Sequence, residues 1–424
     1  MYSWSHTPVN RGFDTFLGQY HGSGDYLTHK LQGGFDFRED YRTQPGNLFR
    51  DSIRKDLRGK YSTYLYTNRT IDLLQNHVQN GNDNPLFIYL AYTNPHKPYK
   101  VPWKEKVRHT LHMPRNETSG GRRSYAAMVS LVDEGVGRIV KSVEDLGLRD
   151  NTLIVFSSDN GAVVNSVGSN YPLRGGKKGM YEGGVRGVCW VNSPLLKNNG
   201  YVNNNLHHVV DWFPTFEYLA SDYGKIKLQN FEHQKLPIDG KNIWDSLNFK
   251  KKVRTEVLIN MGKRWRAKLI KPEVSDVYPR DLSSQTSAAL YTGNKTLSRF
   301  PKHHIPNFKH GKYAVTSSLT VFALRWHFWK LIVGDIEEQW WSSWRNKKDN
   351  SKKERGRIKT GFRLYNLQND EREMRNVAAD NPLVVRIMTM KMKDYIEHVV
   401  PLRRRFEAPR NVAIVDGVWY PWKR

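Results

Sequence analysis

The chain has 424 residues, of which 38% are hydrophobic and 12% aromatic, and its formal net charge is +26. This apolar content supports a folded core and excludes a disordered chain, and the length suits one large domain with a smaller one. No run of about 18 uncharged apolar residues occurs, so no membrane span is expected. No helix-turn-helix, zinc-finger or RNA-binding signature accompanies the positive charge, so a nucleic-acid partner is not expected either.

Residues 1–50 show little helical periodicity and are expected to be rich in loops. The apolar run 86–92 (LFIYLAY) predicts a buried strand, and Ser124–Gly147 carries apolar residues at helical spacing. Ser124 suits an N-cap, and Gly147 suits the position where a helix stops. A second buried strand is predicted over 152–158 (TLIVFSS) because this run is apolar and rich in β-branched residues.

This order predicts a strand–helix–strand unit with two parallel strands and a right-handed crossover. His96 follows the first predicted strand and Asp159 follows the second, so parallel pairing would place both at the same edge of the sheet. Ligand sites in open α/β sheets lie just beyond the carboxyl ends of strands. Asp159 and Asn160 offer a carboxylate beside an amide oxygen, which suits a hard cation such as Ca²⁺ or Mg²⁺. An Asx turn that ends the strand is the alternative.

Eight glycines follow between Gly161 and Gly187, against about 2 expected at the usual frequency. Such a loop lets backbone approach a ligand closely, and Lys177 inside it offers a charge for an anion. Beyond the loop, a further strand is predicted over 185–191, with the single cysteine, Cys189, buried in it as inert core. A helix is predicted to begin near Asp211, with Pro214 in its first turn.

The chain is expected to divide into a catalytic domain over residues 1–300 and a subdomain over residues 301–424. Residues 270–310, which are rich in Ser, Pro, Asn and Lys, are predicted to link them. The subdomain is expected to hold a hairpin over 318–333 with its turn near 325–327, a strand over 362–367 and a covering helix over 381–398.

Several segments resemble sulfatases. Residues 158–161 (SDNG), 172–177 (PLRGGK) and 182–186 (EGGVR) resemble the second signature region of that family, most of all in animal arylsulfatase B and its near relatives. Supporting segments occur in the same order along the chain, at 11–26, 89–102, 211–215, 238–247 and 417–424.

The resemblance implies an alkaline-phosphatase-like α/β sandwich with a mixed, largely parallel sheet, plus a small C-terminal antiparallel sheet and helix. It implies hydrolysis of sulfate esters of glycosaminoglycans or aryl sulfates. Asp159 and Asn160 match part of the family's Ca²⁺ site, Lys177 matches the lysine that holds a sulfate oxygen, and His96 matches the histidine that contacts the sulfate. From pattern alone, His96 could equally be a polar surface residue. Arg174 and Glu182 are expected to pair with each other and brace the loop.

The family's nucleophile is missing from these residues. It lies in a Cys-x-Pro-Ser-Arg motif, whose cysteine becomes formylglycine, and this motif does not occur in the chain. The resemblance also implies two further carboxylate ligands that the chain lacks, so the Ca²⁺ site is expected to be incomplete. The chain therefore reads as an N-terminally truncated sulfatase, and on its own it is expected to be inactive. The alternative is a fragment or pseudoenzyme that binds sulfated polyanions.

Three Asn-x-Thr sequons, at Asn68, Asn116 and Asn294, mark candidate glycosylation sites. With the family resemblance they imply a lysosomal or secreted parent protein, although residues 1–20 show no signal peptide. The densest basic segment, 345–359 (RNKKDNSKKERGRIK), reads as a solvated insertion or as a polyanion-binding patch. Nothing in the sequence predicts an oligomeric state.

Overall fold

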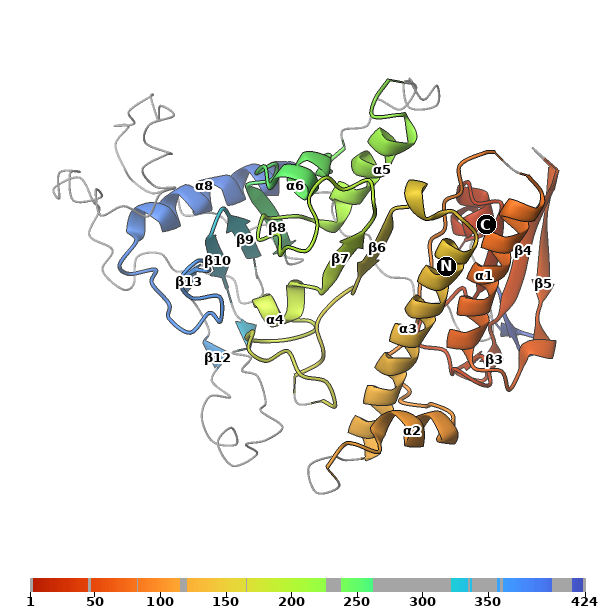
Figure 1. Cartoon of the computed structure of the whole chain (residues 1–424). Coiled ribbons are helices and arrows are strands. Elements are labelled where there is room, and N and C mark those ends of the chain that lie inside the picture. The colour runs from red at the N-terminus through yellow and green to blue at the C-terminus, as the bar shows by residue number, and fades with distance from the viewer. Residues whose placement is uncertain are drawn as a thin grey trace. The chain divides into compact units, whose positions relative to one another are not determined.

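A computed structural model describes residues 3–44, 47–81, 83–114, 120–164, 166–225, 238–261, 322–334, 336–337, 357–358, 361–398 and 414–421. The chain divides into two compact units (Figure 1). The first unit comprises Met1–Ile154, Asn192–Leu195 and Arg404–Arg424, and the second comprises Val155–Val191 and Leu196–Arg403. None of the described helices is long and apolar enough to cross a membrane.

The first unit contains two small sheets, of which the second joins its two sequence ends. One sheet has the antiparallel order β1 (Thr15–Gly18), β4 (Arg38–Gln44) and β5 (Asn47–Ile53). The other has the order β14 (Ile414–Val415), β15 (Val418–Trp419), β3 (Gly34–Phe35) and β2 (Lys30–Leu31). Strand β15 pairs in parallel with β3 through Val418 and Phe35, and Trp419 Nε1 donates to the Leu31 carbonyl at 2.7 Å.

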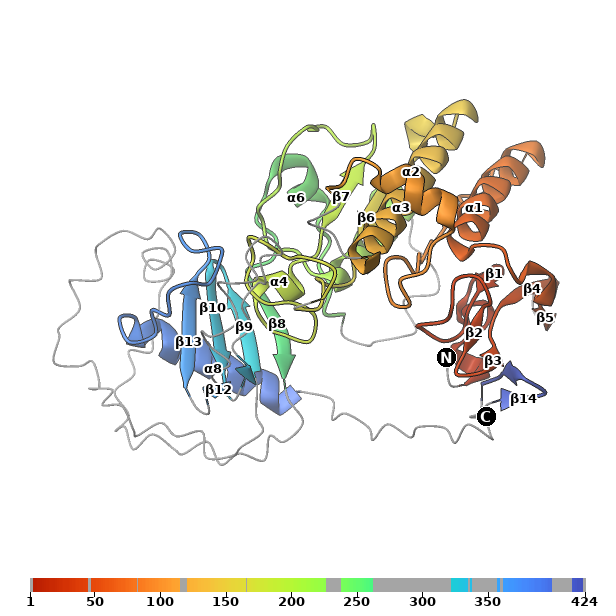
Figure 2. The same ribbon diagram turned by 90° about the horizontal axis from the view of Figure 1, so that it is seen from below.

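The described part of the first unit also contains three α-helices: α1 (Ser62–Gln79), α2 (Trp103–Thr110) and α3 (Gly120–Asp145). Helices α1 and α3 run side by side, and α2 packs against α3 (Figure 2). The predicted helix 124–147 is confirmed as α3, which begins four residues earlier than predicted. Ser124 is therefore not the N-cap: it lies inside the helix, and its Oγ donates to the Gly120 carbonyl at 3.1 Å. Gly147 adopts φ +69° beyond its end, as expected of a stop.

The predicted strand 86–92 is wrong. Residues 85–92 form no strand, and Phe87 and Tyr89 are 60% and 74% exposed. A strand persists only where a neighbour satisfies its backbone groups, and no described strand pairs with this segment. The parallel strand–helix–strand unit predicted from it is therefore not formed.

The strand predicted over 152–158 is confirmed as β6 (Ile154–Ser157), which shares a two-stranded sheet with β7 (Cys189–Asn192). Strand β7 begins later than predicted, because Val185 belongs to the short helix α4 (Glu182–Val185). Cys189 is exposed, so its assignment to the buried core is wrong. Phe156 and Trp190 stack across the two strands with ring centroids 5.4 Å apart.

The second unit carries a four-stranded antiparallel sheet of order β13 (Phe362–Asn366), β10 (Trp329–Val333), β9 (Phe322–Trp326) and β8 (Glu256–Met261). The predicted hairpin is confirmed in β9 and β10, whose turn contains His327 at φ +52°. The predicted helix is α8 (Pro382–His398), which covers one face of the sheet. Its core combines apolar side chains of both: Phe322, Leu324, Leu331, Leu364, Val384, Val385, Met388 and Met392.

The remaining described elements of the second unit are smaller. The predicted helix near Asp211 is α5 (Trp212–Ala220), with Pro214 in its first turn, and α6 (Trp244–Phe249) follows. Strands β11 (Ile336–Glu337) and β12 (Arg357–Ile358) form a two-stranded sheet, so the basic run 345–359 contains a short strand, while its other residues lie outside the described part. The predicted link 270–310 and the predicted boundary at residue 300 also lie outside it.

Candidate functional site

The candidate site lies where β6 ends. Asp159 is exposed, and among the described residues no cation forms an ion pair with its carboxylate. Asn160 is half-buried and donates from Nδ2 to the Gly161 carbonyl at 2.8 Å, which leaves its side-chain oxygen as an acceptor. The end of the strand thus presents two adjacent side chains whose oxygen atoms could bind a cation. The described residues contain no cluster of three or more His, Cys, Asp or Glu side chains that could hold a metal ion.

Asn170 joins this strand end to the glycine-rich loop (residues 161–187). Its Oδ1 accepts from the Ala162 N–H at 2.7 Å, and its Nδ2 donates to the carbonyls of Ala162 at 2.8 Å and Gly175 at 2.9 Å. The Lys177 N–H donates to the same Ala162 carbonyl at 3.0 Å. One side-chain amide therefore holds Lys177 opposite the segment that carries Asp159 and Asn160. The sequence reasoning missed Asn170, because nothing in the local pattern distinguishes it from an ordinary loop asparagine.

Glycines are required where these backbones meet. A Cβ atom on Gly161 would lie 1.8 Å from the Gly183 carbonyl oxygen, and one on Gly176 would lie 2.3 Å from that of Ala162. Both approaches are closer than any side chain permits, so larger residues would force the loop apart. The glycine enrichment seen in the sequence thus reflects close packing of the loop on itself.

Lys177 is the best-placed cation for an anionic ligand in this loop. It is half-buried, and within the described ranges no carboxylate lies at ion-pair distance from its ammonium group. Its neighbour Lys178 is exposed and adopts φ +73°. Through its N–H bond to the Ala162 carbonyl, Lys177 lies beside the segment that follows Asp159 and Asn160, so three of the predicted residues belong to adjoining backbone segments.

The expected pairing of Arg174 with Glu182 is not observed. Glu182 instead accepts from Lys330 at 3.0 Å and Arg325 at 3.2 Å, both on the C-terminal sheet. Arg174 donates to the Glu373 carbonyl at 2.9 Å. The loop is braced as predicted, but by contacts with β9, β10 and the turn after β13, which only the tertiary structure brings near.

Lys330 is the centre of this brace. Its side chain is fully buried and contacts carboxylate oxygens of Glu182 and Glu373, the latter at 2.8 Å. Burial raises the pKa of Glu182, but the charges of Lys330 and Arg325 outweigh it and hold that pKa below its usual range. Burial raises the pKa of Glu373, and the nearby Glu182 charge adds to the rise. The two carboxyls therefore differ in proton affinity, with Glu373 the one that protonates first.

His96 belongs to the first unit and lies in a loop anchored by buried side chains. The Tyr26 hydroxyl, which donates a single proton, lies 2.8 Å from the Thr93 carbonyl and 2.7 Å from that of His96. Asn94 accepts from Thr63 Oγ1 at 2.8 Å and donates to the Met128 carbonyl at 3.0 Å. The imidazole of His96 is exposed, with Nδ1 2.8 Å from the Lys97 carbonyl.

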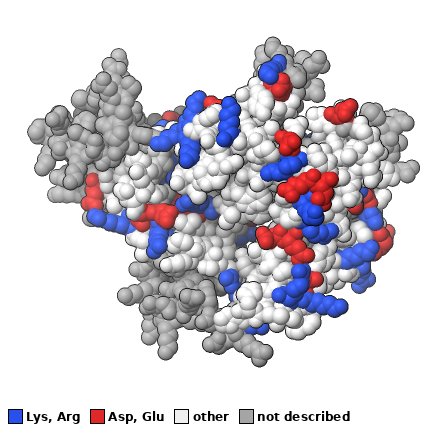
Figure 3. Space-filling view, in the orientation of Figure 1, with Lys and Arg blue, Asp and Glu red and all other residues white. Residues whose placement is uncertain are grey.

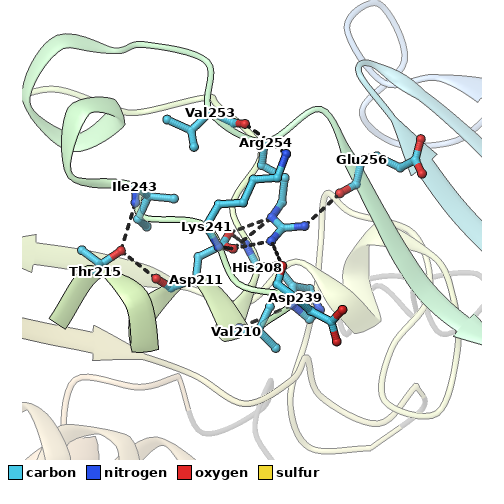
Figure 4. A network of polar contacts seen from close by, with 10 residues as sticks. All are labelled: His208, Val210, Asp211, Thr215, Asp239, Lys241, Ile243, Val253, Arg254 and Glu256. Carbon is cyan, nitrogen blue, oxygen red and sulfur yellow. Dashed lines mark hydrogen bonds and ion pairs between the residues drawn. The ribbon is translucent and has the colours of Figure 1, made fainter. Parts of the chain in front are cut away.

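A second polar network surrounds Asp211 of the DWFPT segment (Figure 4). The fully buried Asp211 carboxylate accepts from Arg254 Nε at 2.8 Å and from the N–H groups of His208 at 2.8 Å and Lys241 at 2.9 Å. Burial raises the pKa of Asp211, but the hydrogen bonds from Arg254 and these two N–H groups outweigh it and hold that pKa below its usual range. Every oxygen of this carboxylate is engaged, so the network is a structural joint between 208–215, 239–243 and 254.

Of the candidate glycosylation sites, only Asn68 is described. It is exposed on α1, and its Oδ1 accepts from Arg138 at 2.7 Å. Asn116 and Asn294 lie outside the described residues.

Comparison with known proteins identifies the family to which the chain belongs. The family model named Sulfatase matches residues 1–222, which is more than half of the chain. The chain belongs to the sulfatase family. It is 30% identical to arylsulfatase J of Mus musculus over 438 residues, covering 98% of this chain and 61% of that protein. It is 27% identical to N-acetylgalactosamine-6-sulfatase of Mus musculus over 220 residues, covering 50% of this chain and 39% of that protein.

Solved structures support the sulfatase fold. The crystal structure of Ps i-CgsB in complex with k-i-k-neocarrahexaose aligns with a TM-score of 0.60 and 22% identity, covering 93% of this chain and 68% of that one. The PsFucS1 sulfatase from Pseudoalteromonas sp. aligns with a TM-score of 0.54 and 18% identity, covering 92% and 67%. The alkaline-phosphatase-like α/β fold class predicted from the sequence is confirmed. The chain thus spans 61% of the length of arylsulfatase J.

Proposed function

We propose that this chain binds the sulfate group of a sulfate ester, as part of an enzyme that hydrolyses such esters. The observation that carries the proposal is the loop in which Asn170 holds Lys177 opposite Asp159 and Asn160, in a member of the sulfatase family. A fixed cation stabilises the negative charge that develops on sulfate oxygens. His96, when protonated, would give a proton to the leaving oxygen.

We infer that the substrates are sulfated glycosaminoglycans or aryl sulfates, as for arylsulfatase B, and that the parent protein is lysosomal or secreted. Two printed names support this: one relative is named N-acetylgalactosamine-6-sulfatase, and one structural neighbour was solved in complex with k-i-k-neocarrahexaose. Both names point to sugars and the first to a sugar sulfate, and the +26 charge of this chain favours anionic polymers.

Ca²⁺ is the cation that the family implies, and the described residues form only part of a site for it. Asp159 and Asn160 supply two oxygen donors, whereas Ca²⁺ takes about six to eight. These two residues do not hold the ion by themselves, and we assign no step of the reaction to it. The expected result of a Ca²⁺ titration of the 424-residue chain is weak binding, with a dissociation constant of about 10⁻³ M or above.

The 424 residues contain no Cys-x-Pro-Ser-Arg motif, and their one cysteine, Cys189, lies on β7. Covalent sulfate transfer needs an activated nucleophile that attacks sulfur while the ester oxygen leaves. We therefore expect this polypeptide on its own to bind sulfate esters without turnover. A pseudoenzyme that binds sulfated polyanions makes the same prediction, and the two differ in whether supplying a nucleophile segment restores hydrolysis.

The test is a calorimetric titration of the purified chain with 4-nitrocatechol sulfate, an aryl sulfate, followed by an assay for released nitrocatechol. Lys177→Ala should weaken binding about tenfold or more, because one charge-assisted contact contributes about 1.5–3 kcal/mol. Lys178→Ala is the matched control, because it removes the same charge from the next position in the loop. The Lys178 side chain is exposed, so its loss should change affinity less than about twofold.

Equal losses in both variants would show that Lys177 has no specific part in binding, and no loss in Lys177→Ala would show that the loop is not the sulfate site. Release of nitrocatechol that follows the chain through purification, and that disappears in Asp159→Ala, would show that the expected inactivity is wrong.

A further inference from the structure

The turn after β13 contacts the glycine-rich loop at three points. The Arg174 guanidinium donates to the Glu373 carbonyl at 2.9 Å, and the Glu182 N–H donates to Glu373 Oε2 at 2.6 Å. The third contact is an ion pair between Arg186 and Glu371, with 3.5 Å between nitrogen and oxygen. Glu373 is fully buried, whereas Glu371 is exposed. The loop is therefore docked on this turn mainly through Glu373.

The loop residues that dock on the turn also support the backbone of the candidate site. The Gly183 N–H donates to the Arg174 carbonyl at 2.7 Å, and the Gly161 N–H donates to the Gly184 carbonyl at 3.1 Å. Gly161 is the first residue after the pair that ends β6. A shift of α4 away from the turn would thus be passed through backbone hydrogen bonds to the residues of the candidate site.

Two carboxyl groups share one buried ammonium at this contact. Lys330 Nζ lies 3.0 Å from Glu182 Oε1 and 2.8 Å from Glu373 Oε1, and the three side chains are at most 4% exposed. Lys330 donates a hydrogen bond to Glu182, whereas Glu373 Oε1 accepts no well-directed hydrogen bond from the described residues. A buried carboxylate is costly unless it is both paired and hydrogen-bonded. Of the two acids, Glu373 is therefore the one whose negative charge is less well satisfied.

Charged and titratable groups face the two acids from the described elements around them: Lys330 on β10, Arg325 on β9, Tyr365 on β13, Arg174 and Tyr181 in the loop, and Arg186 after α4. Burial raises the pKa of Glu373 above its ordinary value of 4.5, and the Glu182 charge adds to the rise against the opposing charge of Lys330. Burial also raises the pKa of Glu182, but Lys330 and Arg325 outweigh it and hold that pKa below 4.5.

We propose that Glu373 is a positioning residue of the glycine-rich loop, and that the loop is docked most tightly when Glu373 carries a proton while Glu182 is ionised. In this state Lys330 and Arg325 keep Glu182 as their counter-ion, and Glu373 Oε2 still accepts from the Glu182 N–H. Loss of the proton to solvent places a second negative charge beside Glu182 in a buried site, so the turn releases the loop more readily. The proposal does not depend on what the loop binds.

The direction of the pH dependence follows from the two shifts. The contribution of Glu373, whose folded-state pKa is raised, is fully present below pH 4.5 and is lost as pH rises through that pKa. The contribution of Glu182, whose folded-state pKa is lowered, is present above pH 4.5 and is lost in stronger acid. The loop should therefore be docked most tightly near pH 4.5 and less tightly at neutral pH.

The test is hydrogen–deuterium exchange of the 424-residue chain, read by mass spectrometry on peptides that cover residues 161–187, from about pH 4.5 to 8. Protection is the exchange rate of an unstructured peptide divided by the observed rate at the same pH, and α1 serves as the reference segment. In wild type, protection of the loop relative to α1 should fall at least about threefold over this range. Glu373→Gln stays neutral and keeps an oxygen for the Glu182 N–H, so its protection should remain near the wild-type value in acid.

Glu371→Gln is the matched control. It removes the same charge from an exposed position of the same turn, and it should keep the wild-type pH dependence. Protection that does not change with pH in wild type would overturn the proposal, as would a Glu373→Gln variant that keeps the wild-type pH dependence.

Glu182→Gln provides a second variant in case thermal melts show that Glu373→Gln does not fold. Without the neighbouring negative charge, Lys330 is left to Glu373 alone, so the fall in protection with pH should shrink; an unchanged fall contradicts the proposal. No ligand is present in these measurements. Their failure therefore leaves the proposed function of the loop untouched, and a failed aryl sulfate titration leaves the role of Glu373 untouched.

Discussion

At the scale of single residues, the amide of Asn170 decides the geometry of the candidate site. It is the only described side chain that both accepts from and donates to Ala162, and it shares the Ala162 carbonyl with the Lys177 N–H. An amide satisfies this arrangement because it has a donor end and an acceptor end. A carboxylate of the same shape has no donor for the two carbonyls.

The variant Asn170→Asp tests this role. At pH 7.5 an ionised carboxylate would face the Ala162 and Gly175 carbonyl oxygens, so the loop should open and aryl sulfate binding should fall about tenfold. The carbonyls disfavour the charged form, so the new carboxyl should have a raised pKa. Binding, measured by calorimetry from pH 7.5 to 4.5 relative to wild type, should therefore recover as pH falls.

Ser169→Asp is the matched control, since it adds the same charge one exposed position away. It should lower affinity for the aryl sulfate only slightly, and its affinity relative to wild type should not rise as pH falls. An Asn170→Asp variant that binds normally at pH 7.5 would show that the amide does not position Lys177.

At the scale of elements, two buried ion networks join segments that are distant in the chain. Lys330 of β10 joins the start of α4 to the turn after β13, and Asp211 joins the start of α5 to Arg254 before β8. Buried charges are costly unless paired and hydrogen-bonded, so each network is sensitive to loss of one partner. The sulfatase-like segments PLRGGK, EGGVR and DWFPT thus contain structural residues beside those of the candidate site.

The variant Asp211→Asn should destabilise the fold by about 3–5 kcal/mol at pH 7, because it leaves the Arg254 guanidinium buried without a counter-ion. The folded-state pKa of Asp211 lies below its unfolded value. Its contribution is therefore present above about pH 4 and is lost as pH falls further. Denaturant midpoints of wild type and variant should differ at pH 7 and converge toward pH 3.

Asp239→Asn serves as the control in the same network. Arg254 donates to the backbone carbonyl of Asp239, while the Asp239 side chain is exposed. The change should therefore lower the free energy of unfolding by less than about 0.5 kcal/mol. A similar loss in both variants would mean that overall charge, and not the buried pair, stabilises this joint.

At the scale of the whole molecule, the net charge is +26, yet the described residues form no continuous basic patch on the face that Figure 3 presents. Figure 3 shows Lys and Arg interspersed with Asp and Glu over the described residues on the face it presents. Much of the excess lies in segments outside the described residues, among them the run 345–359. Retention on polyanions should therefore depend strongly on these segments and on salt.

Neutralising Lys347, Lys348, Lys352 and Lys353 should lower the salt concentration at which the chain elutes from a heparin column, without a large change in melting temperature. The control neutralises three surface lysines already paired with acids: Lys141, Lys225 and Lys251. Unchanged elution would exclude the run as the polyanion site, and a large drop in melting temperature would show that it has a structural role.

The sequence alone determined the family, the glycine-rich loop and the C-terminal hairpin, strand and helix, because these depend on local spacing and on motifs. It did not determine whether residues 86–92 form a strand, because a strand requires a partner and a run of apolar residues does not name one. Nor did it determine the exposure of Cys189, because an apolar strand sequence does not show which element covers the strand.

Only the tertiary structure decided what braces the loop. Arg174 and Glu182 lie eight residues apart, and charge alone suggested a mutual pair. Folding instead brings Lys330 and Glu373 to them from more than 140 residues away, and burial selects those partners because an ammonium between two carboxylates leaves fewer charges unpaired. A lysine inside the apolar run FWKLIV was the one sequence signal of this contact, since such a residue must find a charged partner once its strand is buried.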